Sequence, residues 1–296
     1  MNAGPAPSSA GTPSSAGTPS SAGTPPSAGT PPLRADLMRA ALAGRGAPAG
    51  LWTSLRVVAS TGSTNADLLA RGGPAGQVLV AEVQTAGRGR AGRTWVSRPG
   101  ASLTFSVLLR PSSVPPSARG WLPLLTGVAV AAGVRSAAGV AATLKWPNDV
   151  LVGDRKLAGI LAEQSPDGES VVIGVGLNAA LPESELPVSP TGLPATSLLV
   201  EGADVARETV LVEILRSVER WYAAFAADPD PARSGLLAQY RAACATLGRQ
   251  VRVELPGDRE LVGLAEDVDA SGRLLVRPAG ADAATPVSAG DVLHLR

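Results

Sequence analysis

The chain has 296 residues and one cysteine, Cys244, so its composition excludes a disulfide framework and a cysteine-based zinc site. Its one histidine, His294, is third from the end, and we expect neither a serine–histidine triad nor a histidine-ligated metal. No run of 18 apolar residues predicts a membrane span, and the N-terminus lacks the basic start and apolar stretch of an export signal, so a cytoplasmic protein without a membrane partner is expected.

Positive charge is concentrated between residues 83 and 148, where eight basic residues and no acidic residue occur. The net charge of the whole chain is +1, so the remainder carries −7. Such a segment is expected to bind an anion, which is a phosphate, a carboxylate or nucleic acid. Only two of the 26 basic residues are lysine, Lys145 and Lys156. We interpret them as positions where a compact ammonium is needed, with chance placement as the alternative.

The first 32 residues carry no charged side chain and repeat the hexad Pro-Ser-Ser-Ala-Gly-Thr. Proline, serine, glycine and threonine at this density cannot bury enough apolar surface to offset the entropy of ordering, so disorder is predicted for 1–32. A short helix is expected to follow at 33–43.

An alternation of strands and helices is expected from Leu51 onward. Strands are predicted at 55–59, 77–83 and 102–109, the last with apolar residues at every second position. Between the first two, Thr64 and Asp67 fit a capping box with Thr64 as the N-cap of a short helix. An apolar helix is predicted at 121–138, with Pro123 tolerated in its first turn.

The second half begins with three predicted strands, around Leu144 and at 157–162 and 171–175. The segment 181–194 holds four prolines and is expected to be a mobile surface loop. A helix at 236–246 is also predicted. Between these last two segments, apolar residues at spacings of three and four predict an amphipathic helix: Val210, Leu211, Ile214, Leu215, Val218, Trp221, Tyr222 and Phe225.

The last 48 residues change in character, with short strands separated by turns such as Pro256-Gly257-Asp258. This spacing favours a small β-barrel module, and the boundary is placed near Leu247. The expected strands are 251–254, 261–265, 274–277 and 292–295.

The segment Gly87-Arg88-Gly89-Arg90-Ala91-Gly92-Arg93 is the most informative motif. Its glycines let the backbone pass close to a ligand, and its arginines offer planar guanidinium groups to phosphate and carboxylate oxygens. The GK[ST] ending of a Walker loop is missing, and so is the glycine spacing of a dinucleotide-binding loop. A nucleic-acid-binding arm and a solvated basic loop remain as alternatives.

A second motif is Lys145-Trp146-Pro147-Asn148-Asp149, followed by Arg155-Lys156-Leu157-Ala158-Gly159. Pro147 favours an extended Trp146 and interrupts strand pairing, so Asn148 and Asp149 are expected at a strand end. Asp149 is the first acid after the basic segment and is a candidate partner for Mg²⁺ or a ribose. A hairpin with a structural Asx turn is the alternative, and Trp146 is expected in the core. Gly159 permits close approach by a ligand or by another backbone.

A third motif, Gly174-Val175-Gly176-Leu177-Asn178, places glycines in an apolar strand that ends on an amide. Strand packing explains this motif as well as a ligand does.

Together these segments resemble one family, the biotin protein ligases. The likeness covers about residues 51–296, and the matching residues are Ser63-Thr64-Asn65, Gln84 to Arg93 with Trp95, Lys145 to Asp149, Arg155 to Gly159, and Gly174 to Asn178. The resemblance implies an α/β (α+β) catalytic domain with a mixed sheet and packed helices. It also implies the reaction, in which biotin and ATP, with Mg²⁺, form biotinyl-5′-adenylate. A lysine of a biotin carboxyl carrier protein domain of a biotin-dependent carboxylase then takes the biotinyl group.

The resemblance also assigns roles to residues. The biotin-binding set would be Ser63, Thr64, Asn65, Gln84, Gly87, Arg88, Gly89, Arg90, Lys156 and Gly159. Lys156, Arg88 and Arg90 would act at the reacting oxygens. The ATP-binding set would be Arg90, Arg93, Lys145, Asn148, Asp149 and Asn178, with Asp149 as the Mg²⁺ partner. Fixed cations suit this chemistry because two anions, a carboxylate and a triphosphate, must meet.

Three parts are therefore expected: the disordered repeat at 1–32, a biotin/lipoate-ligase-like catalytic domain at 33–247, and a small β-barrel domain at 248–296. Bifunctional members of the family carry an N-terminal winged helix, whereas this chain has a charge-free repeat there, so DNA binding is not expected.

Two other functions are weighed. A lipoate or octanoate–protein ligase would share the fold, but the arginine–glycine loop with Lys145 to Asp149 argues against it. A nucleic-acid-binding regulator would need a folded DNA-binding module, which residues 1–50 do not provide.

Overall fold

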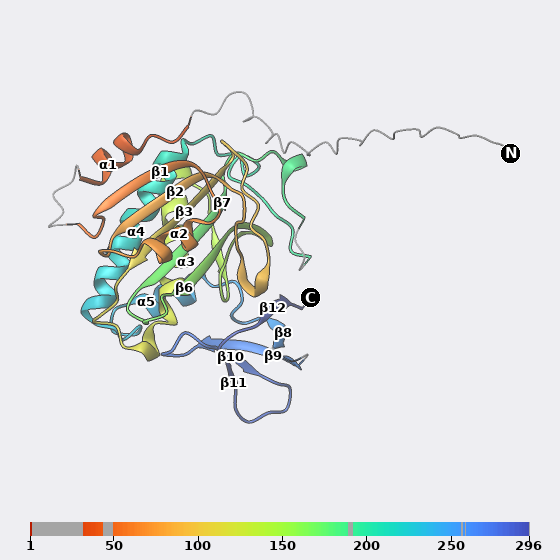
Figure 1. Ribbon diagram of the computed structural model, residues 1–296. Helices are drawn as coiled ribbons and strands as arrows, with labels where there is room; N and C mark the ends of the chain where they lie inside the picture. The colour runs from red at the N-terminus through yellow and green to blue at the C-terminus, as the bar shows by residue number, and fades with distance from the viewer. Residues whose placement is uncertain (2–31, 44–49, 189–191, 256, 258, 296) are drawn as a thin grey trace.

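The computed structural model describes residues 1, 32–43, 50–188, 192–255, 257 and 259–295. Seven strands form the larger of two sheets, in the order β1-β2-β3-β7-β6-β5-β4 (Figure 1). Only the β1–β2 pair is parallel, so this sheet is mixed as expected. The strands are β1 (Ser54–Thr61), β2 (Gln77–Gln84), β3 (Ser102–Leu109), β4 (Thr143–Lys145), β5 (Asp149–Val152), β6 (Arg155–Gln164) and β7 (Val171–Asn178).

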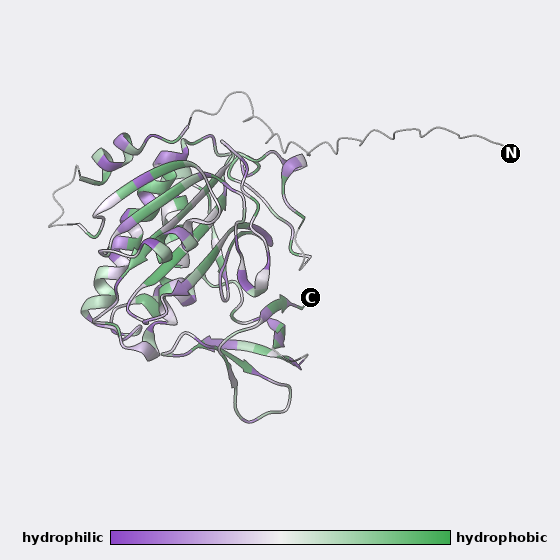
Figure 2. Cartoon of the chain, in the orientation of Figure 1, coloured by the Kyte–Doolittle hydropathy of each residue, from purple (hydrophilic) through white to green (hydrophobic). Residues whose placement is uncertain are grey.

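The two faces of this sheet bury different side chains. On β3, Phe105 and Val107 belong to the main core, whereas Leu108 packs with Leu68 and Val172 in a second, smaller cluster. Alternation along a strand sends neighbouring side chains to opposite faces, so these two clusters lie on opposite faces of the sheet. The strands at the centre are predominantly hydrophobic (Figure 2).

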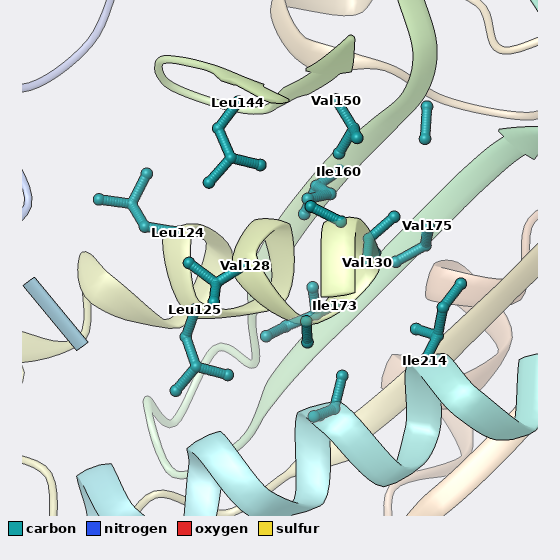
Figure 3. Packing of buried hydrophobic residues seen from close by; sticks show 14 of the residues in the cluster. Leu124, Leu125, Val128, Val130, Leu144, Val150, Ile160, Ile173, Val175 and Ile214 are labelled. Carbon is teal, nitrogen blue, oxygen red and sulfur yellow. The ribbon is translucent and has the colours of Figure 1, made fainter. Parts of the chain in front are cut away.

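The main core lies between the sheet and a pair of helices, α3 (Trp121–Ala138) and α4 (Arg207–Ala227). Figure 3 shows side chains of α3, among them Val128, pointing toward strand residues such as Ile160 and Ile173. The two helices pack closely because Gly133 of α3 lacks a side chain. A Cβ atom there would lie 2.6 Å from the backbone nitrogen of Ile214.

Two predicted helices are therefore confirmed, α3 within the predicted bounds and α4 with the predicted apolar face buried. Among the described residues, α3 is the one helix long and apolar enough to cross a membrane, but 67% of it is buried inside the protein. It is the core helix of this domain, which explains its apolar character on all sides.

The opposite face carries the short helix α2 (Thr64–Arg71), whose Leu68 fills the smaller cluster. The predicted N-cap was wrong by one residue. Ser63 is the N-cap, and its Oγ accepts from the Ala66 N–H, whereas Thr64 is the first helical residue. Asp67 accepts from the Thr61 hydroxyl instead of reaching back to the cap. Ser63 and Thr64 are both good capping residues, so the sequence alone does not choose between them.

The C-terminal residues form a five-stranded antiparallel sheet, in the order β11-β10-β9-β8-β12. Four of its strands were predicted, and β11, three residues that include a proline, was missed. Closure of this sheet into a barrel stays a prediction. The strands are β8 (Gln250–Leu255), β9 (Arg259–Val268), β10 (Leu274–Arg277), β11 (Thr285–Val287) and β12 (Asp291–His294).

Two tryptophans of the larger sheet's domain hold the small sheet in place. The Trp121 indole N–H donates to the Asp269 and Ala270 carbonyls, and that of Trp146 donates to the Gly272 carbonyl at 3.1 Å. Both rings are buried, so Trp146 is a core residue as expected. The turn between β9 and β10 is thereby fixed against α3 and the end of β4.

The remaining helices are α1 (Ala35–Ala43), which packs against α4 and β1, and α5 (Leu236–Ala243). The N-terminal segment is held at Leu33, whose N–H donates to Glu82, and Glu82 is ion-paired with the buried Arg207. The expected disorder of 1–32 falls almost entirely on residues outside the described ranges, as do positions 189–191 of the expected mobile loop.

Candidate active site

A cavity of about 840 Å³ opens on the α2 side of the larger sheet. Its floor is a row of directly paired residues, Thr104 on β3, Gly176 on β7 and Gly159 on β6. All the predicted site residues except Gly87 line it: Ser63, Thr64, Asn65, Gln84, Arg88, Gly89, Arg90, Arg93, Lys145, Asn148, Asp149, Lys156, Gly159 and Asn178. Segments from most of the chain therefore converge on one site.

Glycines in the floor make room for side chains that lie across it. A Cβ atom at Gly176 would be 2.1 Å from the Trp95 ring, and one at Gly174 would be 2.4 Å from Asn65 Oδ1. A Cβ atom at Gly159 would be 3.3 Å from Lys156 Nζ. The glycines of the third motif thus serve close approach by side chains of the site, which strand packing alone does not explain.

One end of the cavity is a cluster of polar side chains at the N-terminus of α2. Gln84 Oε1 accepts from the Thr64 N–H at 2.8 Å and from the Thr64 hydroxyl at 3.0 Å. The Asn65 amide donates to the Leu161 carbonyl and to Glu163, and the Ser106 hydroxyl lies 2.6 Å from both Thr64 Oγ1 and Asn65 Oδ1. These bonds give the cluster a fixed geometry, as a small polar head group requires.

The arginine–glycine loop crosses the cavity as a strap, with each arginine bound to a different element. Arg88 is ion-paired with Glu163 of β6, Arg90 donates to Asn148 Oδ1 at 3.4 Å, and Arg93 is ion-paired with Asp291 of β12 at 2.6 Å. Gly87 does not line the cavity. A Cβ atom there would lie 2.3 Å from the Trp95 carbonyl oxygen, so its glycine allows the strap to fold back on itself.

The second motif forms a tight hairpin between β4 and β5. Lys145 and Asp149 are paired across it, which places Trp146, Pro147 and Asn148 in the turn, as the predicted strand end requires. Strand β5 itself was missed by the sequence interpretation because it is only four residues long. Lys156 Nζ lies 2.6 Å from Asp149 Oδ1 and 5.9 Å from the centre of the Trp95 ring.

Two cations of the cavity have no carboxylate within ion-pair distance in the part of the chain that the structure describes. These are Arg90 and Lys145; burial lowers the pKa of both groups from its usual value. The other basic residues that line the cavity are already paired, as Arg88–Glu163, Arg93–Asp291, Arg155–Glu201, Lys156–Asp149 and Arg249–Asp154. A partly buried, unpaired cation is stabilised by an anion, so this end of the cavity is built to receive one.

Several cavity residues were not predicted from the sequence as site residues. Trp95 and Thr104 lie in the floor, Glu163 anchors Arg88, and Asp291 and His294 come from the last strand. Thr104 had a signal in the sequence, since Ser102, Thr104 and Ser106 alternate with the apolar residues of β3. Asp291 and His294 had none, because only the docking of the small sheet brings β12 to the cavity.

His294 occupies the wall of the cavity and is not a loose tail residue. Its Nε2 atom lies 3.0 Å from the Thr246 hydroxyl, which also accepts from the Trp146 N–H. Burial and the nearby charges of Lys145 and Arg249 lower its pKa from 6.5 to about 4. His294 is therefore neutral at physiological pH, and its ring nitrogens lie near the Thr246 hydroxyl and the Arg249 guanidinium.

The pKa of His294 predicts how stability depends on pH. The folded-state pKa is lower than the unfolded one, so the unfolded chain binds the proton more readily and stability is lost as pH falls from about 6.5 to about 4. Replacing His294 by glutamine removes this contribution. We expect the wild type to lose about 1–2 kcal/mol more than His294→Gln over this range, a value reduced by solvent screening at a half-exposed site. Urea denaturation at several pH values measures it, and equal losses in both proteins would contradict the prediction.

Three carboxylates line the cavity, Asp149, Asp154 and Asp291, and they are ion-paired with Lys156, Arg249 and Arg93 respectively. No group of three or more histidine, cysteine, aspartate or glutamate side chains that would hold a metal occurs in the described ranges. Mg²⁺ that arrives with phosphates is bound by one or two carboxylates in many enzymes, and Asp149, which lines the cavity, is a carboxylate that fits that pattern.

Comparison with protein families gives two matches. Residues 36–178 match the model of the biotin/lipoate A/B protein ligase family, and residues 246–295 match that of the biotin protein ligase C-terminal domain. The cavity residues from Ser63 to Asn178 fall in the first match, and Arg249, Asp291 and His294 fall in the second.

Similar proteins point the same way. The biotin--[acetyl-CoA-carboxylase] ligase of Mycobacterium tuberculosis is 46% identical over 257 residues, which are 83% of this chain and 90% of that protein. The ligase of the same name from Paracoccus denitrificans is 36% identical, over 76% of this chain and 95% of its own. Among solved structures, the biotin protein ligase from Aquifex aeolicus in complex with biotin and ATP has a TM-score of 0.69 and 26% identity, and covers 83% of this chain and 100% of that one.

Proposed function

Because the chain belongs to the biotin protein ligase family, we propose that it activates biotin with ATP and transfers the biotinyl group to a lysine of a carrier domain. The observation that carries the proposal is the cavity whose lining combines a prearranged polar cluster, a glycine floor and two cations that have no ion-pair partner among the described residues. Its volume of about 840 Å³ is near the upper end for small-molecule sites, so it suits two substrates held together.

The first reaction step joins two anions. A carboxylate oxygen of biotin attacks the α-phosphorus of ATP, pyrophosphate leaves, and biotinyl-5′-adenylate forms. Like charges repel in this encounter, and fixed cations at the point where charge builds up lower the barrier. Lys156, Arg88 and Arg90 are assigned to the reacting oxygens, and Lys145, Arg93, Asn148 and Asn178 to the nucleotide; all seven line the cavity, which supports the assignment.

The polar cluster of Ser63, Thr64, Asn65 and Gln84 is assigned to the head group of biotin. Its fixed hydrogen bonds support this role, because a preorganised site loses little entropy when the ligand binds. Gly89 and Gly159 are assigned to the chain between head group and carboxylate, because both line the cavity. Mg²⁺ would be held by Asp149 together with ATP phosphates and would reduce the charge that the arginines and lysines must balance.

In the second step the amine of the carrier lysine attacks the acyl carbon, AMP leaves, and the amide forms as the amine loses a proton. The strap of Arg88, Arg90 and Arg93 would keep water from the adenylate until the carrier arrives. The carrier domain of a biotin-dependent carboxylase is the proposed partner, supported by the names of the relatives. A cytoplasmic location suits an enzyme that uses ATP.

We also propose 33–247 as the catalytic domain and 248–296 as a second domain that completes the site. The two family matches support this division, as do the separate sheets. The absence of a DNA-binding role stays a prediction from the sequence.

Pyrophosphate release tests the function directly. With ATP present, we expect release with biotin, and little with lipoate or octanoate at the same concentration. Addition of a carrier domain should then give a biotin-labelled lysine, seen by mass spectrometry. Release with lipoate but not with biotin would favour the lipoate–protein ligase alternative, which the named relatives do not support.

A further inference from the structure

Three hydroxyl side chains of β3 face the cavity side of the sheet, and two of them are engaged. Ser106 donates within the polar cluster, and Ser102 Oγ accepts from the Arg98 N–H at 3.0 Å. Thr104 lies between them, is 3% exposed and lines the cavity. Its Oγ1 atom has no hydrogen-bond partner among the described residues. Buried hydroxyls are nearly always paired, so an unpaired one facing a cavity points to a ligand group.

The hydrogen-bonding inventory of the polar cluster shows what is missing. Gln84 Oε1 already accepts two bonds from Thr64, and Asn65 Oδ1 lies within bonding distance of the Ser106 hydroxyl. Ser63 Oγ accepts from the Ala66 N–H. Gln84 Oε1 thus already has two donors, and Asn65 Oδ1 and Ser63 Oγ have one each, whereas a cyclic urea brings two further N–H donors that lose water on binding.

We propose that the Thr104 hydroxyl is a further specificity contact, which accepts a hydrogen bond from a urea N–H of the biotin head group. This inference rests on the proposed function. Thr104 is two residues from Ser106 on the same face of β3, so it extends the polar cluster along the cavity floor. In the free protein its unpaired hydroxyl is unfavourable, and the ligand removes that cost on binding.

The test replaces threonine by its isostere valine. For Thr104→Val we expect the dissociation constant for biotin, measured by calorimetry without ATP, to rise about 5- to 100-fold, because a urea N–H stays buried and unpaired. Thr104→Ser keeps the hydroxyl and should stay within about 3-fold of wild type. The dissociation constant for ATP alone should be unchanged in both variants. Biotin affinity equal to wild type in Thr104→Val would overturn the contact.

A matched control comes from β4. Thr143 Oγ1 is also buried without a partner, but Thr143 does not line the cavity. Thr143→Val should therefore leave biotin affinity within about 2-fold of wild type. Both valine variants should melt, without ligand, at or above the temperature of wild type, since an unpaired buried hydroxyl has been removed. A weaker biotin affinity together with undiminished stability is a result that a purely structural role of Thr104 does not give.

Desthiobiotin identifies the group that Thr104 binds, because it retains the urea and lacks the ring sulfur. We expect Thr104→Val to weaken desthiobiotin as much as biotin. A loss confined to biotin would place the hydroxyl at the sulfur and overturn the proposed contact. If wild type itself neither binds biotin nor releases pyrophosphate with it, the function and this contact fail together, whereas unchanged affinity in the variant alone overturns only the contact.

Discussion

Replacing Lys156 by alanine is expected to slow adenylate formation by about 10²–10³-fold, the usual effect of removing one preorganised charge from the reacting atoms. Lys156 is well fixed: its N–H donates to the Pro194 carbonyl, its carbonyl accepts from Thr196, and its ammonium is paired with Asp149. Single-turnover pyrophosphate release, with biotin and ATP both saturating, measures the effect on chemistry and not on binding.

A second variant separates two roles of Lys156, because its removal also leaves the Asp149 carboxylate without its counter-ion. If Lys156 served only to neutralise Asp149, the double variant Lys156→Ala/Asp149→Asn would recover most of the rate. We expect no such recovery. Lys156→Arg should also be slow, since Nζ sits in the narrow space above Gly159 and beside Trp95, where a guanidinium does not fit. A Lys156→Arg variant with the wild-type rate would contradict this reading.

Replacing Arg90 by glycine is expected to impair retention of the adenylate more than its synthesis. Arg90 is the middle of the three arginines of the strap and contacts Asn148 across the cavity. A hydrogen bond to a charged group contributes about 1.5–3 kcal/mol, so its loss should speed escape of the intermediate about 10-fold or more. Free adenylate acylates amines without selection, and an unrelated protein such as albumin should become labelled.

The measurement is the amount of biotin on albumin for each variant, with the same ATP and biotin. Arg98→Gly is the control, because it puts a glycine into the same connection between β2 and β3 but does not line the cavity. Arg90→Ala separates the lost charge from the added backbone freedom. If Arg90→Gly releases pyrophosphate but labels no more albumin than wild type, the retaining role of Arg90 is wrong.

The fold was largely predictable where hydrophobic periodicity is strong. The alternating β3, the apolar α3 and the amphipathic α4 all have many buried positions, and each was placed correctly. The missed strands β5 and β11 have four and three residues, which is too short for a periodic signal. The N-cap of α2 was misplaced because two adjacent residues are chemically suited to it.

The site residues also divide into those that could be predicted from the sequence and those that could not. Most residues of the contiguous motifs, such as Lys145, Asn148 and Asp149, line the cavity. Asp291 and His294 could not be predicted as site residues from the sequence. They line the cavity only because the small sheet is docked by indole hydrogen bonds to the turn between β9 and β10, which is far from them in the sequence. To predict Thr104 as a site residue, one must know which face of β3 borders the cavity. Alternation alone does not distinguish that face from one covered by a helix.

The placement of the two lysines has a consequence for self-modification. When an enzyme makes an activated acyl group, its own exposed lysines are the nearest amines, and they would be acylated first. Here both lysines of the sequence line the cavity, and the rest of the positive charge is carried by arginine. Guanidinium groups stay protonated and do not act as nucleophiles. The rest of the protein therefore offers no further lysine to its own intermediate, and a biotinyl group that escapes is left mainly for the lysines of other proteins.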